Sequence, residues 1–225
     1  MSRLKIVIGN KKYSSWSLRG WLAVRHTELP YEEIQLNLDT PDFYEKITRY
    51  SPARQVPTLI DDDTVVWDSA AIIDYCARLM PDKYWWPEDN KAYAMARSIF
   101  CEMHSGFAAL RNHMPMNMQG RWTGLSLSEQ VNKDVRRIEK IWTQCREQHG
   151  EGGDFLFGGF SAADMMFAPV VSRFITYDIP LNSVAGAYRD AVSAYSSFTE
   201  WHADASHETA IVAIDQLPNT ITRLG

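Results

Sequence analysis

The chain has 225 residues, of which 45% are hydrophobic and 23% are charged. This length allows one or two globular domains with a core large enough to need no disulfide or metal for stability. The formal net charge is −5, whereas proteins that bind nucleic acid or an anionic membrane surface through general electrostatic attraction carry a basic surplus. We therefore expect neither nucleic acid nor a membrane among the partners.

The three cysteines, Cys76, Cys101 and Cys145, lie far apart in the sequence. Their spacing argues against a disulfide framework and against a CxxC metal or redox site. The first ten residues lack the long apolar run of a signal peptide. The most apolar stretch, 155–171, is interrupted by an aspartate and by glycines. We expect a cytoplasmic protein without a bound metal.

The first 80 residues alternate between strand-like and helix-like patterns. In chain order, the expected elements cover residues 4–8, 17–25, 31–36, 43–50, 56–60, 64–67 and 70–79. They read strand, helix, strand, helix, strand, strand, helix. Because a helical crossover joins parallel strands and a short acidic turn joins antiparallel ones, this order predicts an α/β unit with a mixed sheet.

The rest of the chain shows helical patterns alone. A linker with two prolines is expected at 81–90. Helices are expected at 92–113, 126–149, 161–177 and 184–203. The sequence therefore predicts an α/β domain over residues 1–84 and an all-α domain over residues 90–225.

Four short motifs occur in the order and spacing of one known family. They are SSWSLR at 14–19, QVPTL at 55–59, DSAAIIDY at 68–75 and SAAD at 161–164. Together they resemble the cytosolic glutathione transferases. The first motif is similar to the Ser-Ser-Cys-x-x-Arg motif of the zeta class, which includes the maleylacetoacetate isomerases. The resemblance implies a thioredoxin-like N-terminal domain followed by an all-helical glutathione-transferase domain.

The resemblance also implies that glutathione is bound, as co-substrate or cofactor, and that its thiol is activated. A free thiol has a pKa of ~8.5, so the site has to stabilise the thiolate at neutral pH. A hydroxyl group and the positive N-terminus of a helix can both do so. Ser14 and Ser15 precede the first helix and are the catalytic candidates, with Ser14 nearer to the zeta-class pattern. Serines that only cap the helix are the alternative.

The second and third motifs imply the other contacts of glutathione. In the family the proline of the Val-Pro turn is cis, so the backbone of Val56 can pair with an extended peptide as a neighbouring strand would. Ser69 is expected to receive the γ-glutamyl carboxylate at the helix N-terminus, and Asp68 the α-ammonium group. Arg54 is a candidate for the glycyl carboxylate, with a solvated surface arginine as the alternative. The further glutathione-binding candidates are Ser17, Arg19, Gln55 and Pro57.

A pocket for the second substrate is expected in the helical domain. Met103, Phe107, Arg111 and Met114 fall on one stripe of the predicted helix 92–113. The charge of Arg111 among apolar side chains suits the rim of a pocket for an anionic or polarised electrophile. A plain core face is the alternative for Met103 and Phe107. The other candidates are Trp16, which stands where the zeta class has cysteine, and His104 and Asn112.

These features lead to three functional hypotheses. The first is a glutathione transferase that attacks a small electrophile with the thiolate. The second is a zeta-like glutathione-dependent cis–trans isomerase, and the third is a glutathione-binding or regulatory protein without catalysis. The family resemblance and the frequency of two-fold dimers predict a homodimer. The SAAD motif has the spacing of a capping box, so Ser161 and Asp164 are expected to be structural.

Overall fold

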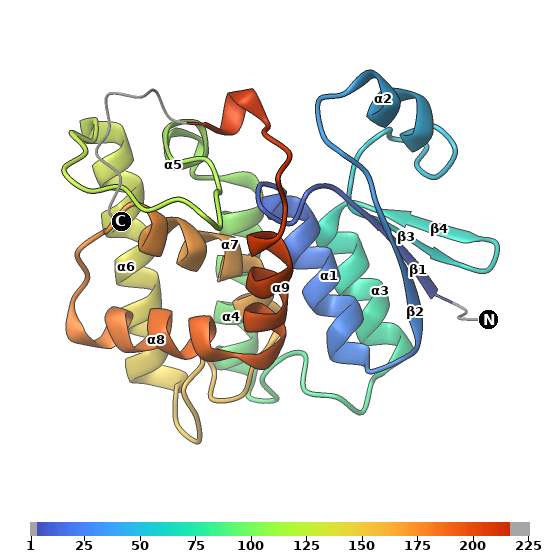
Figure 1. The fold of residues 1–225 in the computed structure, drawn as a ribbon. Helices are drawn as coiled ribbons and strands as arrows, with labels where there is room; N and C mark the ends of the chain where they lie inside the picture. Colours follow the sequence, from blue (N-terminus) through green and yellow to red (C-terminus); the bar gives the residue numbers. More distant parts are fainter. Residues whose placement is uncertain (1–3, 217–225) are drawn as a thin grey trace.

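A computed structural model of the protein describes residues 4–216 (Figure 1). The first part of the chain is an α/β unit. Its elements are β1 (Leu4–Ile8), α1 (Ser15–Thr27), β2 (Tyr31–Gln35), α2 (Pro41–Ile47), β3 (Thr58–Asp61), β4 (Thr64–Trp67) and α3 (Ser69–Leu79). This order confirms the one predicted from the alternating sequence patterns.

The sheet is mixed, as predicted, and has the strand order β2-β1-β3-β4. β1 pairs parallel with β2 and antiparallel with β3, and β3 forms a hairpin with β4. Side chains of β1 alternate between the two faces of the sheet. Ile6 and Ile8 belong to the core that contains α1 and α3, while Val7 packs with Phe43 and Ile47 of α2. The sheet is therefore covered on both faces.

In the second part, all the named elements among the described residues are helices, and isolated β-bridges lie at 155–159. Its elements are α4 (Asn90–Ser105), α5 (Ala108–His113), α6 (Glu129–His149), α7 (Ala162–Thr176), α8 (Ser183–Ala194), α9 (Ser196–Ser206) and a short 3-10 helix, η1 (Ala213–Asp215). α7 lies at the centre, in contact with α1, α4 and α8 (Figure 1). One apolar core continues from α1 and α3 into these helices. The thioredoxin-like unit and the helical unit are thereby fixed against each other.

The single helix predicted over 92–113 is two helices in the structure, so the prediction is wrong around residue 106. α4 ends at Ser105, Phe107 has a left-handed φ of 61°, and α5 begins at Ala108. At Gly106 the backbone passes so close to α4 that a Cβ would lie 2.7 Å from the carbonyl oxygen of Glu102. Glycine permits this close approach. The break turns α5 away from the direction of α4, and the predicted stripe of side chains is lost.

The predicted helix 184–203 is also divided, at Tyr195. The backbone of Tyr195 is extended, with φ −63° and ψ 131°. Its ring stacks on Phe160, with 3.9 Å between the ring centroids and 15° between the planes. This tertiary contact accompanies a break in a segment whose local sequence favours a helix throughout, because packing overrides weak local propensity.

The domain limits 1–84 and 90–225 stay a prediction. The α/β part has its last element ending at Leu79, and α4 begins at Asn90, while residues 217–225 lie outside the described residues. Of the helices in 4–216, none has both the length and the apolar composition that crossing a membrane requires. The same residues contain no group of three or more His, Cys, Asp or Glu side chains that could hold a metal ion.

Candidate active site

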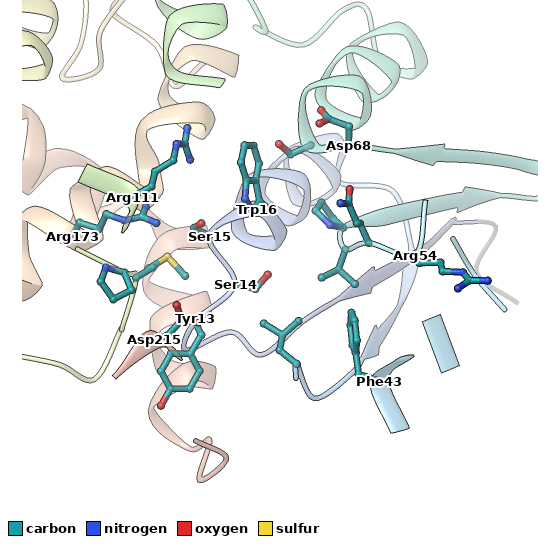
Figure 2. A pocket seen from close by; sticks show the side chains of 17 residues that line it. Tyr13, Ser14, Ser15, Trp16, Phe43, Arg54, Asp68, Arg111, Arg173 and Asp215 are labelled. Carbon is teal, nitrogen blue, oxygen red and sulfur yellow. The ribbon is translucent and has the colours of Figure 1, made fainter. Parts of the chain in front are cut away.

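A cavity of about 550 Å³ lies between the α/β part and the helical part. Figure 2 shows side chains reaching it from both parts of the chain. Ten of the site residues predicted from the sequence line it: Ser14, Ser15, Trp16, Arg54, Gln55, Val56, Pro57, Asp68, Ser69 and Arg111. Three of the four sequence motifs, which are far apart in the chain, therefore meet at one place.

The start of α1 forms one wall of the cavity. Ser14 is the N-cap of α1, and its Oγ accepts a long hydrogen bond of 3.4 Å from the backbone N–H of Ser17. The Oγ atoms of Ser14 and Ser17 are 2.7 Å apart, and Ser17 Oγ accepts from the backbone N–H of Gly9 at 3.0 Å. Ser17 is fully buried behind Ser14. Figure 2 shows Ser15 on the side of Arg111 and Arg173, and Ser14 nearer the centre of the cavity.

The turn before β3 forms the opposite wall. The peptide bond between Val56 and Pro57 is cis, as the family resemblance implies, and both residues line the cavity. Arg54, just before this turn, has a left-handed φ of 55°. Its side chain points away from the centre of the cavity in Figure 2. The charged end of Arg54 therefore lies away from the centre of the cavity.

The N-terminus of α3 points at the cavity with two polar residues. Asp68 is the N-cap, and its Oδ1 accepts from the backbone N–H of Ala70 at 2.7 Å. Its Oδ2 lies 3.3 Å from Nε2 of His104 on α4. Ser69 is only 1% exposed, and its Oγ has no hydrogen-bond partner among the described residues. A buried unpaired hydroxyl beside the positive end of a helix is suited to an anionic ligand.

Trp16 separates this polar region from the helical part. The guanidinium carbon of Arg19 lies 4.6 Å from the Trp16 ring centroid, and that of Arg111 lies 4.8 Å from it. The edge of the His104 ring meets the same indole at 5.4 Å. Cations over an indole are held by its quadrupole. Trp16 is thus the point at which α1, α4 and α5 meet at the cavity.

Three arginines surround this side of the cavity, and their hydrogen bonds go to backbone carbonyl groups. Arg19 Nε donates to Met166 O at 3.0 Å, and Arg173 Nε donates to Met114 O at 2.7 Å. Arg111 donates to the carbonyl oxygens of Met103, His104 and Gly106 at the C-terminal end of α4. These are carbonyls that a helix end leaves without intrahelical partners. Both Nη atoms of Arg19 and Nη1 of Arg111 are buried without a partner in the described part of the chain.

The positive charges of Arg19, Arg111 and Arg173 repel one another. Burial and the charges of Arg111 and Arg173 lower the pKa of Arg19 well below its ordinary value. Burial, followed by the charge of Arg111, lowers the pKa of Arg173 to about 10. Burial also lowers the pKa of Arg111. An anion placed among these groups would relieve the repulsion and pair the free N–H groups.

One acidic side chain enters this region from the C-terminal segment. Asp215, in η1, lines the cavity together with Arg173. Burial raises the pKa of Asp215 to about 6, with Arg173 opposing the shift and Asp39 adding to it. The carboxyl group is therefore poised to change its charge in a mildly acidic range, and it partly offsets the positive charge of Arg173.

Some predicted site residues lie outside the cavity lining. Met103 and Met114 are fully buried in the core, because the break at Gly106 separates the two halves of the predicted stripe. Phe107 packs against that core, and Asn112 is exposed on α5. Ser17, Arg19 and His104 contact lining residues from behind and are not themselves among them. The roles of all these residues stay predictions.

Seven lining residues were not predicted from the sequence: Tyr13, Leu38, Phe43, Pro115, Met116, Arg173 and Asp215. Tyr13 adjoins the serines, so the first motif could have pointed to it. Arg173 is the single basic residue in the apolar pattern of 161–177, and a charge with no capping role in a buried helix is such a signal. Asp215 carries no comparable signal, since only the course of the segment after α9 brings it to the cavity.

Comparison with known families agrees with the fold. The family model described as "Glutathione S-transferase, N-terminal domain" matches residues 13–79, and the model "Glutathione S-transferase, C-terminal domain" matches residues 102–204. Among solved structures, a glutathione transferase homologue from Burkholderia gl BGR1 with bound glutathione has a TM-score of 0.67 at 19% identity, covering 92% of this chain and 99% of that one. The holo structure of maleyl pyruvate isomerase, a bacterial zeta-class protein, has a TM-score of 0.70 at 17% identity, covering 92% and 100%.

Curated relatives include maleylacetoacetate isomerases and zeta-class glutathione S-transferases. A probable maleylacetoacetate isomerase from Caenorhabditis elegans is 23% identical over 205 residues, which cover 88% of this chain and 92% of the relative. Glutathione S-transferase Z1 from Arabidopsis thaliana is 26% identical over 196 residues, covering 79% and 85%. With both parts of the fold matched by their own family models, the chain belongs to the glutathione S-transferase family and is a zeta-like, glutathione-dependent enzyme.

Proposed function

We propose that the cavity binds glutathione along the α/β part, with the γ-glutamyl carboxylate at the N-terminus of α3. The observation that carries this proposal is the Ser69 hydroxyl, which is buried, unpaired and part of the cavity lining. A ligand carboxylate would supply its missing partner and meet the positive end of the α3 dipole. The carboxylate of the preceding residue, Asp68, would bind the α-ammonium group. The cysteinyl backbone would pair with Val56 at the cis-proline turn.

In this arrangement the thiol of glutathione lies at the N-terminus of α1. In the free protein the Ser14 hydroxyl donates to Ser17 Oγ at 2.7 Å, and Ser17 Oγ also accepts from the backbone N–H of Gly9. When a thiolate is bound, the Ser14 hydroxyl would turn its proton to the sulfur and accept from Ser17 instead. Ser14 can then donate its proton to the thiolate, as the catalytic residue. Ser15 faces the arginine side and is placed to meet the second substrate. Ser17 and Arg19 would not contact glutathione themselves. Ser17 would orient Ser14, and Arg19 would orient Trp16.

Replacing Ser69 with alanine is expected to weaken glutathione binding by about 1–3 kcal/mol, as for a hydrogen bond to a charged group. Isothermal titration calorimetry on the purified protein measures this loss. Ser98→Ala is a matched control, because the Ser98 hydroxyl on exposed α4 surface donates only to the carbonyl of Ala94. Equal affinity of the Ser69→Ala and wild-type proteins would contradict the γ-glutamyl site.

The second substrate is proposed to lie beside Trp16, Arg111 and Arg173. The unpaired Nη1 of Arg111 and the mutual repulsion of the arginines favour an electrophile that carries negative charge. This observation also favours a second candidate function, the isomerisation of a conjugated keto acid. In that reaction the thiolate adds to a carbon–carbon double bond, the resulting single bond rotates, and the thiolate leaves again.

The two reactions differ in the fate of glutathione. An isomerase is expected to convert maleylacetone to its trans isomer while the concentration of free glutathione stays constant. A transferase is expected to consume one glutathione per electrophile. Following substrate absorbance and free thiol in the same reaction separates them. Conversion with stoichiometric loss of thiol would contradict the isomerase, and conversion without loss would make isomerisation the main activity.

We further propose a homodimer in a reducing cytoplasm. Apolar side chains are exposed on both parts of the chain, with Trp67 on β4 47% exposed and Tyr93 on α4 44% exposed. A contact between the α/β part of one subunit and the helical part of the other would cover them. Light scattering at micromolar concentration is expected to give the mass of two chains. The mass of one chain would contradict the dimer. The three free cysteines suit a reducing compartment.

A further inference from the structure

The carboxylate of Asp68 is held from two sides. Its Oδ1 accepts from the N–H of Ala70 at 2.7 Å, within its own helix. Its Oδ2 lies 3.3 Å from Nε2 of His104, which belongs to the last turn of α4 in the helical part. Each oxygen thus has a partner atom in the protein, while Asp68 still lines the cavity. Each oxygen keeps lone pairs for a further donor.

His104 is itself held in place. Its ring and the Trp16 indole meet edge to face, with 5.4 Å between their centroids. Its Nδ1 is buried without a hydrogen-bond partner among the described residues, so its polar contact to the rest of the protein is through Nε2. The sequence predicts that His104 lies in the electrophile pocket. In the structure its contact with Asp68 puts it next to the side of the cavity formed by Asp68 and Ser69. An N–H at Nε2 that faces the Asp68 carboxylate can orient it.

We propose that His104 is a positioning residue for glutathione: it aims the Asp68 carboxylate at the α-ammonium group of the γ-glutamyl residue. The helical part would then contribute to glutathione recognition through Asp68, with no contact of its own to the ligand. This inference rests on the proposed function, because it takes the γ-glutamyl group to lie at the N-terminus of α3.

The test compares glutathione with an analogue that lacks only the α-amino group. His104→Phe keeps a ring beside Trp16 and removes the donor, whereas His104→Gln keeps a donor of similar reach. We expect His104→Phe to raise the Kd for glutathione about five- to ten-fold, as for loss of one charge-assisted contact. The Kd for the des-amino analogue is expected to be the same in wild type and variant, and His104→Gln is expected to restore most of the glutathione affinity.

Kinetics and a double variant make the test specific. The KM for glutathione should rise in His104→Phe while kcat at saturating glutathione stays unchanged. In an Asp68→Asn background, His104→Phe should cause no further loss. His113→Ala, on an exposed histidine of α5, is the matched control and should bind both ligands like the wild type.

Two results would overturn the inference. One is an equal loss of affinity for glutathione and for the analogue, which would indicate a general structural effect. The other is unchanged glutathione affinity in His104→Phe. Failure of the proposed function looks different, because the wild-type protein itself would then bind neither glutathione nor the analogue.

Discussion

Ser14→Ala is expected to raise the pKa of the bound glutathione thiol by about one unit or more, equivalent to ~1.4 kcal/mol of lost thiolate stabilisation. The Ser14 hydroxyl lines the cavity and donates to Ser17 Oγ in the free protein. With the thiolate bound it would donate to the sulfur instead. The measurement is a pH titration of the thiolate absorbance of the enzyme–glutathione complex. At neutral pH the rate with an electrophile should fall in proportion to the thiolate fraction.

Two further variants separate this effect from helix capping. Ser14 is also the N-cap of α1, and alanine at an N-cap costs about 1 kcal/mol of stability, whereas glycine costs only a few tenths. Ser14→Gly should therefore raise the thiol pKa as much as Ser14→Ala while destabilising the protein less. Ser15→Ala should leave the thiol pKa close to that of the wild type. If no serine variant changes the thiol pKa, the serine mechanism is wrong. The N-terminus of α1 or the arginines would then have to stabilise the thiolate.

Asp164→Ala is expected to destabilise the protein by about 3–5 kcal/mol, since it leaves several buried donors without an acceptor. The Asp164 carboxylate accepts from Leu156 N at 3.1 Å, from Ser161 N at 2.8 Å and from Ser161 Oγ at 2.7 Å. These bonds close the capping box of α7 and hold the preceding loop. Urea denaturation of wild type and variant measures the difference.

An exposed cap provides the comparison. Asp89 accepts from Lys91 N and Ala92 N at the start of α4, but it is exposed, so water can replace the lost acceptor. Asp89→Ala should cost about 1 kcal/mol. A similarly small loss for Asp164→Ala would contradict the structural role assigned to the buried box, and would leave the position of α7, and with it Arg173, without this support.

The α/β unit was predictable because its signals are local. Each strand has a short run of β-formers bounded by turn residues, and the Val56–Pro57 turn and the Asp68–Ser69 cap are encoded by adjacent residues. The glutathione side of the cavity is built from these same local motifs. For that reason the residues predicted for this side line the cavity together, except Ser17 and Arg19, which lie behind the lining.

The electrophile side was less predictable because it depends on packing between distant segments. Arg111 and Arg173 lie on different helices, α5 and α7, and Asp215 arrives after α9. The stripe that was expected to carry Met103 and Met114 into the pocket fails at Gly106, where a single close backbone approach redirects the chain. Periodicity describes one continuous helix and carries no information about such a break.

The most direct test of the central claim is a crystal structure of the protein with glutathione. The account predicts glutathione in the cavity between the two parts, with its sulfur within hydrogen-bond distance of Ser14 Oγ and its γ-glutamyl carboxylate on Ser69 Oγ. The α-ammonium group should face Asp68. A cavity that stays empty at saturating glutathione, or glutathione bound with its sulfur away from the α1 N-terminus, would contradict the claim.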